Sequence, residues 1–520
     1  MKNIFFSLLI VLVFSACNVE VENPNALTVD AYWKTEADAQ AGLNAVYNTF
    51  YKPDVYTRWF WFRTDLTSDE GFSSSPWGEL KEWTQFVYNN YDFGEGNRFT
   101  YAQSYKAIFR CNQVIANMPG IAMDETKKNQ ILGQAYFVRA LNFYNLAVLW
   151  GSSNKSIPIV LEPSTNNPGM QPEGHTEGEV FNQAISDLTF ATINLPETWG
   201  SSEKGRASKG AALALRAKCY MQLKQWSDAS ADLAWLVEGQ GASIYNLTPN
   251  YSDNFTKDAE NNIESVFEIQ YSDVNGSPAG DGDYDMNPNL GQNRGQFFAP
   301  PGIGWTDGEI RPWIVTEFKK EKDNSGNVDI RLKSTAFYEG QEVDFVNNAK
   351  IYKYTSSPVL WSQGNMKGRV FIRKYGADYK DYDDYYNPIN IRLIRYADVL
   401  LLYAECLANS GNLPKAVGLV DRVRTRVNMP SLATNHLSST LTPAAFLKQL
   451  QMERTLELAT EGHRWGDLKR WGVLDSQTGV DELKNRDSDF NNFVIGKHNC
   501  LPIPTTEKGN NPNQAQNPNY

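Results

Sequence analysis

The densest group of ionisable side chains lies near the end of the sequence, where acids and bases could perform catalysis or pair with one another. The group consists of Glu453, Glu457, Glu461, His463, Arg464 and Asp467. A spacing of four residues places the three glutamates along one face of a helix, with nearby arginines as partners. The sequence offers no identifiable second catalytic group, and perturbed networks of this kind are often structural. We therefore interpret the segment as ion pairs that tie a helix to the core.

Aromatic residues suggest a different chemistry, namely binding. They make up 13% of the chain, with 14 Trp and 26 Tyr, which is more than a core requires. Sugars have flat C–H faces and rings of hydroxyls, so a sugar site combines exposed aromatic rings with fixed polar groups. Two loop-like regions offer that combination: the first is residues 71–98, and the second lies in a central segment over 239–390. The residues predicted to contact a ligand are Trp77, Trp83, Asn89, Tyr91, Tyr284, Arg294 and Trp305.

The tryptophans of the first region differ in their sequence surroundings. Trp77 stands between Pro76 and Gly78, as expected of an exposed loop residue, and is the strongest candidate. Trp83 is either a binding platform or a packing residue, since Glu82–Trp83–Thr84 could form a strand. Trp59 and Trp61 precede this region, in the segment RWFWF, and are expected in the core.

An acidic run in the second region has the alternating oxygens of a calcium loop. It consists of Asp281, Asp283, Asp285 and Asn287. Met286 replaces the glycine that an EF-hand loop needs, and Gln292 replaces its bidentate glutamate. We interpret the run as a solvated loop and expect no metal or other cofactor, with a calcium site of another geometry as the alternative.

Composition and motifs exclude several functional classes. The chain has 49 Lys and Arg against 60 Asp and Glu, a formal charge of −11, and it lacks a basic run, so no nucleic-acid partner is expected. The motifs H-E-x-x-H and G-x-S-x-G, the P-loop and the Rossmann fingerprint are absent from the sequence. A glycosidase needs only two facing carboxylates, so that class of enzyme stays open at this point.

The first 17 residues have the pattern of an export signal. Lys2 is followed by an apolar run from Ile4 to Phe14, which is too short to span a bilayer, and then by Ser15, Ala16 and Cys17. Small residues directly before a cysteine are typical of a bacterial lipobox. We expect residues 1–16 to be a lipoprotein signal peptide, Cys17 to be lipidated and residues 17–27 to form an acylated tether. The alternative is a secreted protein cleaved near Ala16.

The other four cysteines are Cys111, Cys219, Cys406 and Cys500. None belongs to a C-x-x-C pair, which argues against zinc-ribbon and thioredoxin-type sites. Cys219 and Cys406 lie inside apolar helical patterns, so we expect buried free thiols rather than disulfides.

Helical periodicity dominates residues 28–238. Thr35 and Asp38 resemble a capping box before a helix that begins near residue 36. Further helices are predicted over 101–118, over 131–150 and from residue 177 to Pro196. A last helix is predicted from an N-cap at Thr442, with proline at its first position.

An internal repeat connects the two halves of the chain. Residues from 213 align with residues from 400 at an offset of 187, so that Ala217 matches Ala404 and Ala229 matches Ala416. Small residues at these positions resemble a tetratricopeptide unit, in which two antiparallel helices approach closely. Between the units, residues 239–390 are rich in Gly, Pro, Asn, Asp and Tyr, so we expect a loop-rich insertion with a few short strands.

Taken together, these segments resemble the SusD/RagB family of nutrient-binding outer-membrane lipoproteins. The resemblance is carried by WKTEADAQAGLNAVYNTFY after the leader, TSDE at 67–70, RYADVLLLYAECLANSG at 395–411 and ERTLELATEGHRWGDLKRWG at 453–472. It implies a mainly α fold of SusD-like tetratricopeptide-type helical pairs, with an N-terminal region over 28–238 and a C-terminal SusD/RagB region over 239–520. Asn519 departs from the family's usual glycine, but Asn also tolerates a left-handed turn.

The resemblance also implies a function. Members of this family face outward on the outer membrane, anchored by lipid, and bind oligosaccharides or other nutrients for a SusC-like TonB-dependent transporter. It further implies binding without catalysis, with the segment after TSDE contributing to the ligand site. Two alternatives stay open: a tetratricopeptide-type protein scaffold, and a binder of a non-glycan nutrient such as a peptide. A surface glycoside hydrolase would require an acid pair within an aromatic cleft.

Overall fold

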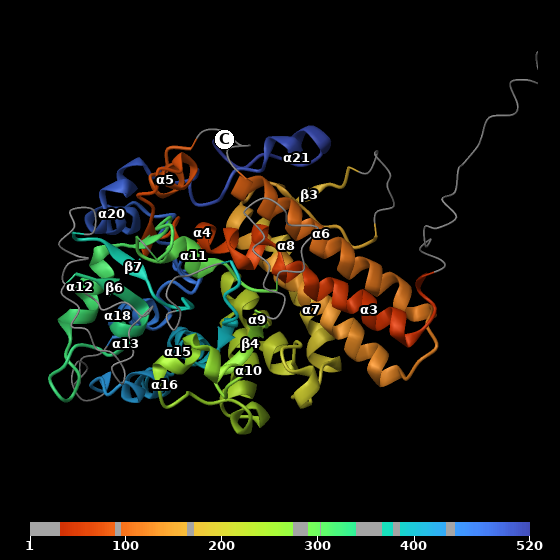
Figure 1. The fold of residues 1–520 in the computed structure, drawn as a ribbon, viewed down its shortest axis with the longest axis horizontal. Helices are drawn as coiled ribbons and strands as arrows, with labels where there is room; N and C mark the ends of the chain where they lie inside the picture. The colour runs from red at the N-terminus through yellow and green to blue at the C-terminus, as the bar shows by residue number, and fades with distance from the viewer. Residues whose placement is uncertain are drawn as a thin grey trace, which may run out of the picture.

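Long antiparallel helices form most of the structure (Figure 1). The computed structural model describes residues 32–88, 95–163, 171–273, 290–301, 303–339, 367–377, 385–432 and 442–520. Within these ranges the strands are few and short, which confirms the expected mainly α class. No helix in these ranges has both the length and the apolar character that crossing a membrane requires.

The first half of the chain supplies four of the main helices. They are α3 (Glu36–Tyr47), α6 (Glu95–Asn117), α7 (Glu125–Trp150) and α8 (Glu177–Asn194). Helix α3 begins at the predicted capping box, in which Thr35 Oγ1 accepts a hydrogen bond from the backbone N–H of Asp38. Helix α6 begins at Glu95, before the predicted start at Tyr101. The helices pack in chain order, α6 on α7 and α7 on α8.

The two predicted repeat units are helical pairs that lie side by side. The first is α9 (Lys209–Gln222) with α10 (Trp226–Val237), and the second is α15 (Tyr396–Asn409) with α16 (Leu413–Arg426). Helix α10 packs directly on α15, although the whole insertion separates them in sequence. Ala217 and Ala404 are fully buried, as are Ala229 and Ala416, so their lack of bulk lets the helices approach closely.

The insertion folds around two small antiparallel sheets. Strands β4 (Ser265–Ile269) and β8 (Ile391–Arg395) pair with each other. Strands β5 (Glu309–Ile310), β6 (Ala336–Tyr338) and β7 (Val370–Ile372) form the second sheet with β1 (Gly71–Phe72), in the order β1-β5-β7-β6. Three short helices that the loop-rich composition did not predict also lie here: α11 (Arg294–Phe298), α12 (Pro312–Lys320) and α13 (Arg331–Thr335). Tertiary packing stabilises such short helices.

Two short helices, α4 (Trp59–Asp65) and α5 (Gly78–Thr84), lie beyond α3 and contain Trp59, Trp61 and Trp83, while Trp77 immediately precedes the second of them. Trp59 and Trp61 lie on α4 and are fully buried, as predicted. Residues 82–84, considered above as a strand, belong instead to α5. A further two-stranded pair joins β2 (Ile157–Pro158) to β3 (Gly174–His175).

The C-terminal helices return to the N-terminal part of the chain. They are α18 (Pro443–Leu458), α19 (Arg464–Arg470), α20 (Gln477–Arg486) and α21 (Thr505–Asn510). Thr442 caps α18 by accepting a hydrogen bond from Ala445 N–H, as its sequence position predicted. Helix α19 packs on α4, and Figure 1 shows the C-terminus beside α5 and α21. Residues far apart in sequence therefore meet around α4 and α5.

The four cysteines after Cys17 are free and buried, as predicted. Burial raises the pKa of each thiol, that of Cys500 to about 12, so none is a reactive thiolate at neutral pH. We expect a soluble form beginning at residue 18 to react with a thiol reagent at none of these cysteines when folded and at all four when unfolded. A reductant should leave its thermal midpoint unchanged. A midpoint that falls on reduction would contradict the free-thiol assignment.

Candidate functional site

Two loops from distant parts of the chain meet where β1 pairs with β5. Gly71 lies opposite Ile310 and Phe72 opposite Glu309, so the residues after TSDE run beside the loop that precedes β5. Ser75 Oγ donates a hydrogen bond of 2.5 Å to Asp307 Oδ1 across this boundary. The pairing therefore brings the first aromatic region and part of the second together, as a shared ligand site requires.

Each loop holds one of the predicted tryptophans at the surface. Trp77 is half-buried, with its ring edge-to-face against Trp59 at a centroid distance of 4.9 Å. Trp305 is 47% exposed and packs edge-to-face on Phe297 at 5.0 Å and on Tyr385 at 5.7 Å. Phe62 contacts both Trp77 and Phe297. Buried aromatic rings thus support both surface tryptophans.

The backbone around Trp305 fixes the position of its ring. Trp305 N–H donates to the carbonyl of Gln296 at 2.7 Å, and Asp307 N–H donates to the carbonyl of Phe297 at 2.7 Å. Thr306, between them, has a φ of +63°, which a non-glycine residue rarely adopts. Backbone strain of this kind often occurs where a side chain must be presented in one orientation.

Polar groups lie next to the two loops. Asp307 and Glu309 are buried, and Glu309 forms an ion pair of 2.9 Å with Arg369, whose side chain is 23% exposed. Arg369 also donates to Ser74 Oγ at 3.1 Å, and Ser74 in turn contacts Glu309. Ser74 and Arg369 remain accessible beside the aromatic faces, as a sugar site needs, whereas the buried Ser75, Asp307 and Glu309 hold the two loops in position.

Two of the predicted ligand residues lie in the interior instead. Trp83 is only 2% exposed and packs against Trp59 on the inner side of α5, so it is a packing residue and not a platform. Arg294 is fully buried and forms an ion pair of 3.1 Å with Asp65, above the ring of Trp61. The predictions that these two side chains contact a ligand are therefore wrong for this conformation, because burial removes both from the surface.

Other predicted positions lie outside the described residues. They are Asn89, Tyr91 and Tyr284, together with the acidic run Asp281, Asp283, Asp285 and Asn287. Their assignments stay predictions. Within the described ranges, no group of three or more His, Cys, Asp or Glu residues lies close enough to hold a metal ion.

Sequence reasoning missed Ser75, Asp307 and Arg369 as members of the site. The bond between Ser75 and Asp307 joins residues 232 positions apart. No local pattern marks such a pair, since it depends on the register of two-residue strands. The available sequence signal was proximity alone: Ser75 lies two residues before Trp77, and Asp307 lies two residues after Trp305.

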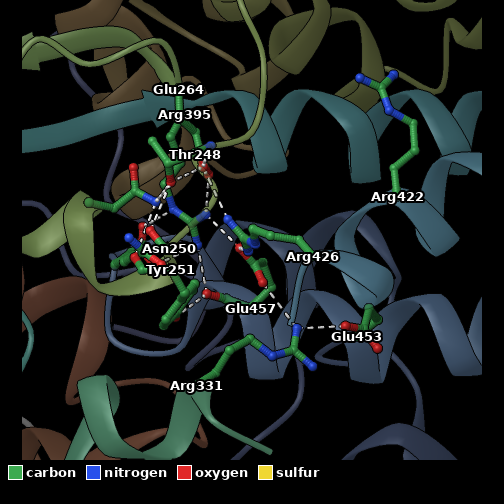
Figure 2. Close-up of polar contacts among 12 residues, drawn as sticks. Thr248, Asn250, Tyr251, Glu264, Arg331, Arg395, Arg422, Arg426, Glu453 and Glu457 are labelled. Carbon is green, nitrogen blue, oxygen red and sulfur yellow. Dashed lines mark hydrogen bonds and ion pairs between the residues drawn. The ribbon is translucent and has the colours of Figure 1, made fainter. Parts of the chain in front are cut away.

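The three glutamates of the ionisable segment belong to a buried cluster of ion pairs, part of which is shown in Figure 2. Arg395 at its centre contacts Glu264 at 2.8 Å, Glu457 at 2.6 Å and Glu461 at 2.7 Å. Around it lie the further members Arg331, Lys374, Arg424, Arg426 and Glu453. All of these side chains are at most 4% exposed. We call this set the interior charge cluster.

The electrostatics of the interior charge cluster are those of a structural element. The surrounding arginines hold the pKa of Glu457 well below its usual range, and Arg395 and Lys374 lower that of Glu461 to about 2. These carboxylates are therefore ionised at neutral pH, with their oxygens occupied by arginine and lysine donors. The structure confirms the interpretation that these glutamates tie the segment to the core. Only Glu453 and Glu457 lie on α18, however, because the helix ends at Leu458. Glu461 belongs to the turn that follows, so the prediction of three glutamates on one helix face is wrong for Glu461.

The TSDE segment is fastened to the C-terminal helices by a second set of contacts. Asp69 pairs with Arg464 and with Arg486, each at 2.6 Å, and the two arginines lower its pKa to about 2. Glu70 accepts a hydrogen bond from Thr460 N–H at 3.0 Å. These contacts hold the start of β1 in place, and β1 carries the loop with Trp77.

Comparison with known proteins assigns the family. The model of the SusD family matches residues 263–520, and a model described as "Starch-binding associating with outer membrane" matches residues 19–221. The chain belongs to the SusD family, as its motifs predicted. SusD-like protein P2 of Formosa agariphila is 28% identical over 552 residues, covering 100% of this chain and 99% of that protein.

Solved structures have the same fold. A SusD superfamily protein from Bacteroides vulgatus superposes with a TM-score of 0.77 at 24% identity, covering 94% of this chain and 99% of the other. A protein described as laminarin-binding and SusD-like superposes with a TM-score of 0.74 at 25% identity, covering 94% of this chain and all of the other.

The interior charge cluster allows a matched test, because α16 carries one arginine that belongs to it and one that does not. Arg426 contacts Glu264 and Glu457, whereas Arg422 points away from the cluster (Figure 2). Arg422 instead donates a hydrogen bond of 3.3 Å to the hydroxyl of Tyr396. Arg426→Met should lower the free energy of unfolding by about 3 kcal/mol, since it leaves buried carboxylates short of a partner. Arg422→Met should have little effect. Equal losses in denaturant unfolding would contradict a structural role for the cluster.

Glu70 gives a test based on pH. Burial raises the pKa of Glu70 to about 8, so the folded protein keeps a proton that the unfolded chain, with an ordinary pKa of 4.5, has released. Its contribution to stability therefore falls as the pH rises from about 4.5 to 8. Glu70→Gln mimics the protonated acid, so it should stabilise the protein more at pH 8 than at pH 5. If the thermal midpoints of Glu70→Gln and the unchanged protein differ by the same amount at pH 5 and at pH 8, the raised pKa of Glu70 is contradicted.

Proposed function

We propose that this protein binds a glycan at the cell surface and delivers it, chemically unchanged, to a SusC-like TonB-dependent transporter. The observation that carries the proposal is the pair of surface tryptophans, Trp77 and Trp305, on loops joined by the β1–β5 pairing. Their rings are supported from below by Trp59 and Phe297, and the accessible polar side chains Ser74 and Arg369 lie on the same group of loops and strands. This arrangement suits the flat face and the hydroxyls of a sugar.

The comparisons supply the ligand class with which to begin. The laminarin-binding SusD-like protein shares 25% identity over 94% of this chain, which makes a β-linked glucan the first glycan to examine. We propose binding without catalysis, because the acids of the motif-rich segment are held in ion pairs of the interior charge cluster. The acids next to Trp305 are likewise bonded to Ser75 and Arg369.

The placement on the outer membrane is also part of the proposal. The short apolar leader ending in Ser15, Ala16 and Cys17 supports a signal peptide over 1–16, lipidation of Cys17 and a tether over 17–27. The model described as "Starch-binding associating with outer membrane" matches the residues that follow, from 19. The organisation that we propose is an outward-facing lipoprotein with an N-terminal helical region over 28–238 and a C-terminal SusD/RagB region over 239–520, which includes the loop-rich insertion.

Calorimetry with laminarin oligosaccharides and a panel of other glycans tests the site. Trp77→Ala and Trp305→Ala should each weaken binding at least about tenfold, because each removes a preformed aromatic face. Trp226→Ala is the matched control, since Trp226 is also half-buried but lies on α10. A dissociation constant that the combined Trp77 and Trp305 substitutions leave unchanged would show that the site lies elsewhere.

The same samples distinguish the alternative functions. Release of reducing ends during incubation would show catalysis and overturn the binding-only proposal. Binding of peptides but of no glycan would favour a non-glycan nutrient, and binding of neither would favour a protein scaffold. Co-purification of the transporter with the tagged lipoprotein from outer membranes tests the proposed partnership directly.

A further inference from the structure

A cleft of about 230 Å³ lies apart from the tryptophan loops. Its walls come from the loop between α8 and α9, the residues that follow the 3-10 turn η5 (Gln240–Ser243), and the turn that enters β4. None of its lining residues belongs to the site described above. The volume lies below the roughly 300–1,000 Å³ of pockets for drug-sized ligands and suits a group about the size of one ring.

The apolar wall of the cleft is preformed. The indole N–H of Trp199 donates to the carbonyl of Ala207 at 2.8 Å, which fixes a ring that is only partly buried. Ile263, in the turn before β4, is 49% exposed, and its carbonyl accepts a hydrogen bond from Asn246 N–H at 3.1 Å. Exposed large apolar side chains in a concave surface commonly mark a binding site.

Close packing holds the two main walls together. Gly205 has a φ of +89°, and a Cβ atom at this position would lie 2.3 Å from the side chain of Gln270. The loop between α8 and α9 therefore rests directly against the end of β4. Gln270 also accepts a hydrogen bond of 2.8 Å from the amide of Asn261, which lines the cleft. The same side chain thus contacts both walls.

The polar groups of the cleft carry both signs of charge. Glu197 and Lys204 line it, and neither has a hydrogen-bond or ion-pair partner within the part of the chain that the structure describes. The amides of Asn261 and Asn262 stand beside them and keep donor capacity, since each makes only one side-chain N–H bond there. With one charge of each sign, the cleft has no net electrostatic preference for an anion or a cation, and a sugar hydroxyl can accept a hydrogen bond from Lys204 and donate one to Glu197.

We propose that this cleft is a second carbohydrate site, which binds a neutral sugar ring between Trp199 and Ile263. The ring's C–H face packs on the fixed indole. Its hydroxyls bond to Glu197, Lys204 and the two asparagine amides. The proposal does not depend on the function assigned to Trp77 and Trp305, because the two sites share no residue.

The test measures what remains when the first site is removed. In the full-length lipoprotein, purified in detergent and carrying Trp77→Ala with Trp305→Ala, saturation-transfer NMR is recorded with laminaritriose, maltotriose and cellotriose. At least one of these should still bind, with a dissociation constant of about 1 mM or above, as expected of a single-ring contact. Absence of saturation transfer to all three would overturn the proposal.

Substitutions then locate the residual binding. Trp199→Ala should weaken it at least about fivefold, and Lys204→Ala, an exposed substitution that leaves packing intact, should weaken it about threefold. Trp226→Ala should have no effect. Residual binding that neither cleft substitution changes would contradict the proposal, as would tighter binding of trigalacturonate than of the neutral trisaccharides.

The two proposals fail in different ways. If the cleft is inactive, Trp199→Ala has no effect in the otherwise unchanged protein, while Trp77→Ala still weakens binding. If the first site is misplaced, the Trp77 and Trp305 substitutions have no effect, while Trp199→Ala weakens binding on its own. Thermal midpoints of all variants identify any that have lost the fold, and Lys204→Ala serves as the readout if Trp199→Ala is among them.

Discussion

The architecture depends on the cost of burying charge. An unpaired charge in a protein interior is strongly destabilising, so each member of the interior charge cluster requires its partners in place. Those partners come from different elements: Glu264 precedes β4, Arg395 ends β8 and Glu457 lies on α18. The insertion, the second helical pair and the C-terminal helix therefore have to assemble together. Apolar packing alone would tolerate many arrangements of these elements, whereas bidentate arginine contacts restrict their relative orientation.

The same constraint reaches the surface loops through one segment. Asp69 is fixed by Arg464 and Arg486 from the C-terminal helices, and β1 begins two residues later. Because β1 pairs with β5, the position of the buried carboxylate also determines where the loops of Trp77 and Trp305 lie. An aromatic surface offers little specificity unless its rings hold their spacing. Buried electrostatics thus provide the rigidity that the exposed aromatic residues require.

Local sequence signals predicted helices well and the exposure of candidate ligand residues poorly. Capping residues such as Thr35 and Thr442 act within four positions, and the alanines of the repeat follow helical spacing, so both could be read directly. The glutamates on α18 showed their role through periodicity and the neighbouring arginines. Trp83 and Arg294 could not be placed, because burial depends on which distant element covers a short helix. Likewise, the role of Asp307 follows from a strand register that no nearby residue encodes.

The pairing of β4 with β8, together with the contact between α10 and α15, has a consequence for how this protein can diversify. Because β4 and β8 are neighbours, residues 270–390 begin and end at adjacent points of the helical framework (Figure 1). They therefore form an insertion whose two ends are held together by the framework. Doubling the length of a flexible loop costs only about 0.6 kcal/mol in closure entropy. Insertions and deletions in the surface loops of this segment can therefore accumulate, provided that Arg331 and Lys374 keep their places in the interior charge cluster. Specificity can evolve quickly in a protein whose framework changes slowly.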